Sequence, residues 1–172
     1  MTPARAAAGG EPASLRRRLA CFAYEGVLLF GVVMTTGLAY GLLVQQRHAL
    51  HGLRGLQLTL FVVLGLYFVW FWSRSGQTLA MKTWRIQLVG RDGRPPTPAR
   101  ALLRYLLSWL WFLPALLAAW AAQLHSTAAI AGVVAAGVLG YAALTRASPQ
   151  RQYLHDRIAG TRLLLAPTPP PR

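Results

Sequence analysis

Four long apolar runs, separated by polar segments, dominate the pattern of hydrophobic and polar positions along the 172-residue chain. A helix rises about 1.5 Å per residue, so crossing about 30 Å of hydrocarbon takes roughly 20 residues. Each run is close to that length and is expected to form a membrane-spanning helix; the runs are residues 19–44, 56–72, 105–122 and 126–144. In an alternative with three spans, the last run, mainly Ala, Gly and Val, would be merged or omitted.

Residues within the runs add local detail to this prediction. The last two runs are joined by only four residues, QLHS at 123–126, so their helices are expected to form an antiparallel hairpin. Pro114 lies in the middle of the third run, where its ring and missing N–H are expected to kink the helix. Tyr67, Trp70 and Trp72 close the second run, a position typical of aromatic residues at a membrane–water interface.

The polar segment between the second and third runs contains a strand-like pattern. Trp84, Ile86 and Leu88 alternate with polar residues, and a period of two indicates a short strand. A second strand-like run, TRLLL at 161–165, lies near the end of the chain. Four spans would put both segments on one side of the membrane, so residues 83–89 and 161–165 are expected to pair.

A short helix is expected just before that last run. Ser148 would cap its start, and Gly160 would end it. Tyr153, Leu154 and Ile158 would share an apolar face. The helix is therefore expected to lie along the membrane surface or to dock under the helical bundle.

The two ends of the chain differ from the rest. Residues 1–14 are small and Pro/Gly-containing without an apolar period, and residues 166–172 are rich in proline. Both are expected to be disordered tails. Between them, residues 15–165 have the length of a single domain.

Composition excludes an ordinary soluble domain. Hydrophobic residues make up 55% of the chain and charged residues 13%, whereas roughly a quarter of the residues in soluble domains are charged. The expected fold class is an all-α integral membrane protein. Its four transmembrane helices would carry a small amphipathic or strand element on the cytoplasmic side, and the lipid bilayer would be its first partner.

The net charge of +14 indicates membrane topology rather than nucleic-acid binding. The basic residues flank the apolar runs, and no soluble basic domain is present to hold them. Of the 18 Lys and Arg residues, only Arg47 and Arg54 fall outside the two ends and the second loop. The positive-inside rule therefore predicts that both termini are cytoplasmic.

Glu25 is the most informative residue of the first run, because the chain has only four acidic residues. It lies six residues past Leu19, roughly 9 Å along a helix and deeper than its short side chain easily reaches water. A charged group at the centre of a membrane helix costs about 2.5–3.5 kcal/mol on insertion scales. Such a residue is expected to be paired, neutral or functional.

Several partners for Glu25 remain open at this stage. Arg18 lies two turns earlier on the same helical face, too far for reliable direct contact but close enough for bridging by water or another helix. Protonation is a second possibility, and an arginine of the cytoplasmic loop or tail is a third. Functionally, Glu25 is either a buried anchor for helix packing or a proton, cation or substrate site. Contact with a partner protein is a further alternative.

Asp156, in the segment LHDRIAGT, is the other carboxylate of interest. His155 precedes it, but neighbours on a helix do not face each other, so a salt bridge with a loop arginine is preferred over an acid/base pair. No catalytic residue is predicted, because no nucleophile, base and orienting group are arranged together. The single cysteine, Cys21, and the absence of metal-ligand spacings predict neither a metal site nor a cofactor.

Taken together, three motifs resemble the RDD family of bacterial membrane proteins. RRRLACFAYEG resembles the family's first motif, with Arg18 at the arginine position and Glu25 at that of the first aspartate. SGQTLAMKTWRIQLVGRDGRP is similar to its loop, and LHDRIAGT to its closing motif, with Asp156 as the second aspartate. Two departures are Glu25, which adds a methylene but keeps the acid, and Ala80, where the family usually has glycine.

The resemblance implies a polytopic inner-membrane protein of poorly defined molecular function. The leading hypothesis is a small transporter or ion-coupled exchanger that uses Glu25, with Arg18 and Asp156 in the same charge network. Because four spans make a thin pathway, a homo-oligomer is expected. The second hypothesis is an accessory protein that binds another membrane protein, in which Glu25 would be satisfied only in the complex.

Overall fold

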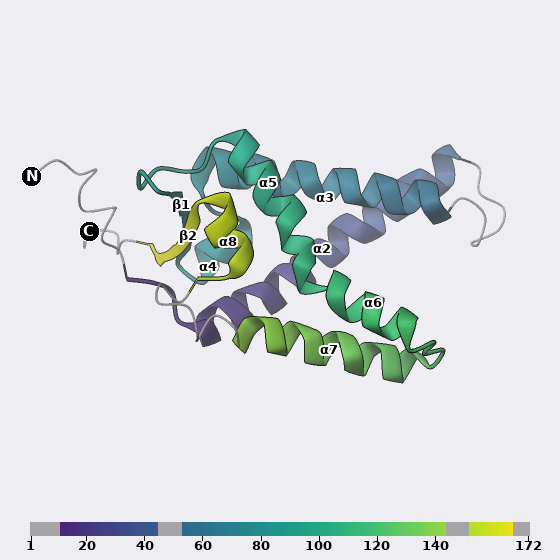
Figure 1. Ribbon diagram of the computed structural model, residues 1–172. Coiled ribbons are helices and arrows are strands. Elements are labelled where there is room, and N and C mark those ends of the chain that lie inside the picture. Colours follow the sequence, from purple (N-terminus) through teal and green to yellow (C-terminus); the bar gives the residue numbers. More distant parts are fainter. Residues whose placement is uncertain (1–10, 45–52, 144–151, 167–172) are drawn as a thin grey trace, which may run out of the picture.

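The computed structural model describes residues 11–44, 53–143 and 152–166. Long helices extend from one end of the molecule, where short helices and two strands form a compact group that we call the cap (Figure 1). The cap consists of α4 (Leu79–Thr83), β1 (Ile86–Gly90), α8 (Leu154–Ala159) and β2 (Thr161–Leu165).

Three helical segments are long and apolar enough to cross a membrane. They are α2 (Leu15–Leu43), α3 (Leu53–Ser75) and the interrupted segment Pro98–Ala121. The fourth apolar run forms α7 (Thr127–Ala143), a shorter apolar helix of 17 residues. All four predicted apolar runs are therefore helical, and three of them have spanning length.

Capping residues explain why two of these helices begin earlier than their apolar runs. The Ser14 hydroxyl accepts a hydrogen bond from the Arg17 N–H at 3.4 Å, so α2 begins at Leu15 rather than at residue 19. Thr97 does the same for the Arg100 N–H, also at 3.4 Å, in the segment predicted to start at residue 105. Hydrophobicity marks the part of a helix suited to lipid, whereas the cap marks where the helix starts.

The third apolar run is broken near its proline. It consists of α5 (Pro98–Ser108), a 3₁₀ turn η1 (Trp109–Trp111) and α6 (Leu113–Ala121). Pro114 lies in the first turn of α6, where a missing N–H is tolerated, and its ring would clash with the Leu110 carbonyl of a continuous helix. The kink predicted at the proline therefore lies just before it.

The two predicted strands pair, as expected from the sequence. β1 and β2 are antiparallel, with Ile86 opposite Leu165 and Gly90 opposite Thr161. The N-terminal segment adds to this sheet, because the Leu165 N–H donates to the Glu11 carbonyl at 2.9 Å. The stretch expected to be a disordered tail through residue 14 is thus ordered from Glu11 onwards; residues 1–10 lie outside the described part.

α8 differs from the helix predicted before the last strand. It begins at Leu154, and the predicted cap Ser148 lies outside the described residues. Gly160 ends the helix in the left-handed conformation, at φ 66°, as predicted. Tyr153 precedes the helix and is buried, so it does not share the face of Leu154 and Ile158, which are about half exposed.

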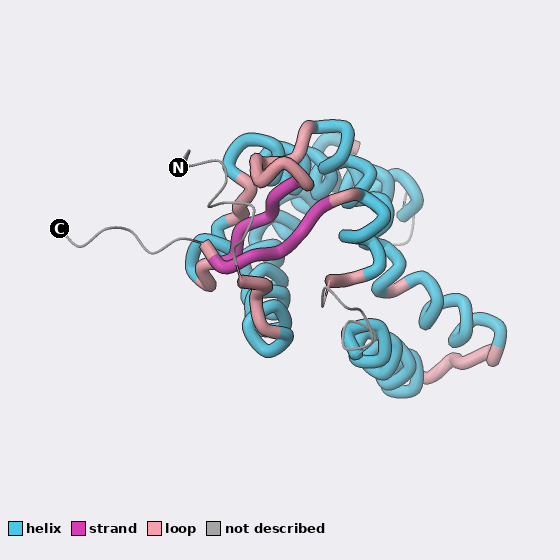
Figure 2. Tube along the Cα trace, turned by 60° about the vertical axis from the view of Figure 1, so that its left-hand side comes forward, coloured by secondary structure: helices cyan, strands magenta, loops and turns pink. Residues whose placement is uncertain are grey.

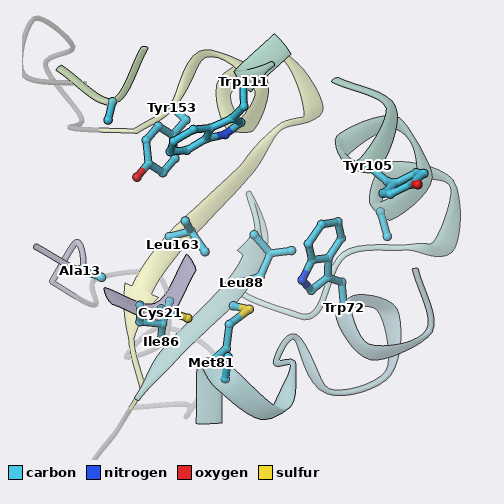
Figure 3. Close-up of a cluster of buried hydrophobic side chains, with 13 residues drawn as sticks. Ala13, Cys21, Trp72, Met81, Ile86, Leu88, Tyr105, Trp111, Tyr153 and Leu163 are labelled. Atoms are coloured by element: carbon cyan, nitrogen blue, oxygen red, sulfur yellow. The ribbon is translucent and has the colours of Figure 1, made fainter. Parts of the chain in front are cut away.

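Two helical hairpins diverge as they leave the cap (Figure 1). One is formed by α2 and α3 and the other by α6 and α7, and a second view also shows α6 and α7 standing apart from the rest (Figure 2). A buried cluster joins the helices to the cap, with Trp72 of α3, Met81 of α4, and Leu88 and Leu163 of the sheet (Figure 3). The molecule is therefore most tightly packed at its cap end.

Candidate functional site

Glu25 is buried on α2, and two hydroxyl groups of the same chain bind its carboxylate. The Tyr67 hydroxyl of α3 donates to Oε1 at 2.8 Å, and the Thr78 hydroxyl donates to Oε2. Thr78 also accepts a hydrogen bond from the Met81 N–H at 3.2 Å, because it caps α4. Three separate segments therefore meet at this carboxylate.

The chemistry of these partners matters for what Glu25 can do. A hydroxyl donates to an ionised carboxylate, and it also accepts from a protonated one after rotating its own proton. A guanidinium can only donate and would favour the ionised form alone. The Tyr67 and Thr78 hydroxyls are thus compatible with either protonation state of Glu25.

Asp156 is held in a different way, by an arginine. Arg104 Nε lies 2.9 Å from Asp156 Oδ1, and the side chains are 8% and 0% exposed. The guanidinium of Arg104 also lies 4.1 Å from the centre of the Trp72 ring, within cation–π distance. The salt bridge predicted between Asp156 and a loop arginine is confirmed, although the arginine belongs to α5.

His155 adjoins this pair and is buried. The Tyr141 hydroxyl accepts from the His155 backbone N–H at 3.2 Å, and it also lies 2.9 Å from His155 Nδ1. The other ring nitrogen, Nε2, lies 3.4 Å from Asp156 Oδ1. Burial lowers the pKa of His155 to about 4, so the ring is neutral near pH 7.

The contact between His155 and Asp156 corrects the expectation that these neighbours do not face each other. Both side chains lie in the first turn of α8 and turn inward under the helices. The two side chains come close enough for the imidazole of His155 to contact Asp156 Oδ1. This part of the sequence reasoning was wrong because it assumed the side-chain directions of a long exposed helix.

Arg18 is also buried, near the start of α2. Its guanidinium lies 5.5 Å from the centre of the Tyr153 ring. Burial raises the pKa of Tyr153 to about 12, so this ring is an uncharged phenol near pH 7. Arg18 thus contacts the segment that carries Asp156.

A cavity of about 430 Å³ lies between α2, α3, α5, η1 and the cap. Arg18, Glu25, Arg104 and His155 line it, together with a mainly apolar and aromatic wall. Asp156 does not line the cavity and contacts it through Arg104. The structure therefore brings Arg18 and Glu25 to one cavity and places Asp156 behind its wall.

Four residues of this site were not identified from the sequence as members of it. Tyr67 was interpreted only as an interfacial aromatic, and Thr78, Arg104 and Tyr141 were not singled out. A hydroxyl within an apolar helix is a weak signal for Tyr67. For the other three, the sequence offered no signal, because their partners are distant along the chain.

Metal binding finds no support in the part of the chain that the structure describes. There, no three His, Cys, Asp or Glu side chains lie close enough together to hold a metal ion. Cys21 is buried and forms no disulfide. The chemistry available at the cavity is that of guanidinium, carboxylate, imidazole and hydroxyl groups beside aromatic rings.

Comparison with known proteins gives one finding. The model of the RDD family matches residues 12–160, which include the first two motifs, the closing motif except Thr161, and the cavity wall except Leu163. The comparison with curated proteins found no match, and neither did the comparison with solved structures.

Proposed function

The chain belongs to the RDD family, and from this premise we propose that it is a transporter or ion-coupled exchanger of the bacterial inner membrane. In this proposal the cavity binds a small ligand, and Glu25 carries a proton or cation. The observation that carries the proposal is a buried carboxylate on a helix of spanning length, which lines a cavity and is held by hydroxyl groups. Ionisable residues within membrane spans are generally functional.

The topology belongs to the same proposal. α7 adds a fourth span, since 17 residues rise about 26 Å and the hairpin with α6 brings it beside the third span. Both termini are cytoplasmic, and so is the cap. Ten exposed cationic side chains on and around the cap support this orientation: Arg16, Arg17, Arg74, Lys82, Arg85, Arg91, Arg94, Arg100, Arg157 and Arg162.

The other two predicted site residues take supporting roles. Arg18 adds positive charge to the cavity that Glu25 lines. Asp156 orients Arg104 through their salt bridge. A homo-oligomer would complete a pathway that four spans alone leave thin.

The accessory-protein hypothesis is less well supported. It predicted that Glu25 would be satisfied only in a complex. The hydrogen bonds from Tyr67 and Thr78 satisfy this carboxylate within one chain. They remove the reason for invoking a partner at Glu25, although they do not exclude a partner elsewhere.

Ion flux tests the proposal. The purified protein is reconstituted in vesicles that contain a pH-sensitive dye, and Na⁺, K⁺ and pH gradients are imposed in turn. We expect dye responses with the native protein and none with Glu25→Gln, because glutamine keeps the size of the side chain but does not titrate. Equal responses from the native protein and a folded Glu25→Gln variant would contradict the role given to Glu25.

A further inference from the structure

The cavity wall is suited to an apolar molecule over most of its surface. Phe22, Leu29, Leu64 and Phe68 line it with hydrocarbon and aromatic rings. At about 430 Å³, the cavity falls within the range of roughly 300–1,000 Å³ that is typical of small-molecule sites. An apolar chain would therefore replace lipid or water contacts along this wall.

The cap end of the cavity is rich in hydrogen-bond donors. The guanidinium groups of Arg18 and Arg104 belong to residues that line it, against the single carboxylate of Glu25. Trp72 also lines it and has a buried indole N–H without a hydrogen-bond partner in the described parts of the chain. Trp72 is 5% exposed, and its nitrogen edge is turned into the buried cluster (Figure 3).

Such a set of donors matches an anionic acceptor. An indole N–H can only donate, and a guanidinium offers up to five N–H groups in a planar fork that fits carboxylate and phosphate oxygens. Glu25 already accepts from two hydroxyls, and Asp156 accepts from Arg104. The unsatisfied indole N–H of Trp72 therefore points to an acceptor supplied by a ligand.

The cavity opens on the side of α2. Phe22 and Gly26 line the cavity and are also exposed at the surface of the molecule. Gly26 lies eight residues past Arg18, or about 12 Å along the helix. In a membrane-spanning α2, the donor-rich end therefore lies near the interface, and the opening faces hydrocarbon.

We propose that the cavity binds a single-chain anionic lipid from the bilayer, with its head group at Arg18 and the Trp72 indole and its acyl chain along the apolar wall. This inference deepens the proposed transport function and rests on it, since it names the ligand class of the same cavity. A head group at the interface and a chain in hydrocarbon keep each part of the lipid in its ordinary surroundings. Entry from the side then needs no aqueous path.

Photocrosslinking tests the proposal with the full chain in phosphatidylcholine nanodiscs. The probe is a palmitate analogue with a diazirine on its chain, and mass spectrometry identifies the labelled peptides. We expect labelling of α2 and α3 segments that line the cavity, with competition by palmitate at least tenfold stronger than by its uncharged methyl ester. Labelling that neither competitor reduces, or equal competition by both, would overturn the proposal.

Matched variants separate a cavity site from general contact with lipid. Gly26→Phe is expected to fill the cavity and reduce competable labelling at least tenfold, because a Cβ at Gly26 meets no atom within 4 Å. Gly31→Phe is the control, since Gly31 has the same free space but does not line the cavity. Arg18→Gln should weaken labelling similarly, and Arg17→Gln, at an exposed neighbour, should not. Equal labelling of Gly26→Phe and Gly31→Phe would reject the cavity as the site.

Binding is measured without a gradient, so its outcome is independent of transport. Competable labelling in a protein that shows no flux would support the lipid site and remove the transport function. Flux without competable labelling would support the transport function and remove the lipid site.

Discussion

At the residue scale, the two buried carboxylates of this protein are held by different kinds of group. Asp156 pairs with Arg104, whose guanidinium can only donate hydrogen bonds. Glu25 is bound by the hydroxyls of Tyr67 and Thr78, which suit either protonation state. In our proposal, Asp156 therefore has a positioning role and Glu25 the titrating role.

Removing the charge of Asp156 is expected to destabilise the protein strongly. Asp156→Asn would leave Arg104 buried without its counter-ion, which typically costs about 3–5 kcal/mol. Asp92→Asn is the matched control, because Asp92 is exposed. Denaturant unfolding in detergent micelles measures both variants. A loss for Asp156→Asn no greater than that for Asp92→Asn would show that the buried pair contributes little.

His155 is expected to make stability depend on pH. The pKa of His155 is about 4 in the folded chain, against about 6.5 when unfolded, so the unfolded state binds more protons between these values. The free energy of unfolding should therefore fall as the pH decreases from about 6.5 towards 4, by on the order of 3 kcal/mol. Asp156, Arg104 and the Tyr141 hydroxyl face the ring and are part of this balance.

The pH profile of unfolding in micelles checks this prediction. His155→Gln should have a flatter profile over that range, whereas His125→Gln, at an exposed position, should keep the native slope. A native slope in His155→Gln would mean that other groups cause the pH dependence.

At the scale of helices and strands, the elements that follow local chemistry were predictable. The apolar runs gave the long helices, alternation at Ile86 and Leu88 gave β1, and Gly160 gave the end of α8. The start of α5 was missed because Thr97 caps a turn that is amphipathic rather than apolar. α4 was missed because five residues carry too little periodicity to be recognised.

The candidate site was only partly predictable for a related reason. Arg18, Glu25 and Asp156 stood out because charged groups are rare in or beside apolar runs. Tyr67 and Arg104 contact them across 42 and 52 residues of sequence, and no local pattern encodes such contacts. Which distant residues become partners depends on how the helices pack, and this packing is set by the complete fold rather than by a local sequence pattern.

Two glycine substitutions, one just after α8 and one within α7, are expected to change stability in opposite directions. Gly160→Ala should destabilise the protein by about 1 kcal/mol, because Gly160 adopts φ 66°, a conformation that disfavours a Cβ. Gly132→Ala should stabilise it by roughly 0.5–1 kcal/mol, because Gly132 lies within α7 and a Cβ there meets no atom within 4 Å. Unfolding midpoints in micelles check both, and destabilisation by both variants would contradict the assignment of α7 as a regular helix.

At the scale of the whole molecule, the packing is uneven along the helices. The cap, the ion pair and the cavity lie together at one end, and the two hairpins diverge from it (Figure 1). In the proposed topology, this arrangement puts the charged groups near one membrane interface and leaves the far ends of the hairpins to lipid. In our account, ligand binding and proton or cation transfer both occur at the cap end.

The central claim is that Glu25 acts as a titrating carboxyl, and replacing it with aspartate or glutamine tests this most directly. Proton flux would be measured in dye-loaded vesicles for the native protein, Glu25→Asp and Glu25→Gln, each confirmed to be folded. The account predicts flux with Glu25→Asp, reduced by the shorter reach to Tyr67, and none with Glu25→Gln. Flux retained by glutamine, or lost equally in both variants, would contradict it.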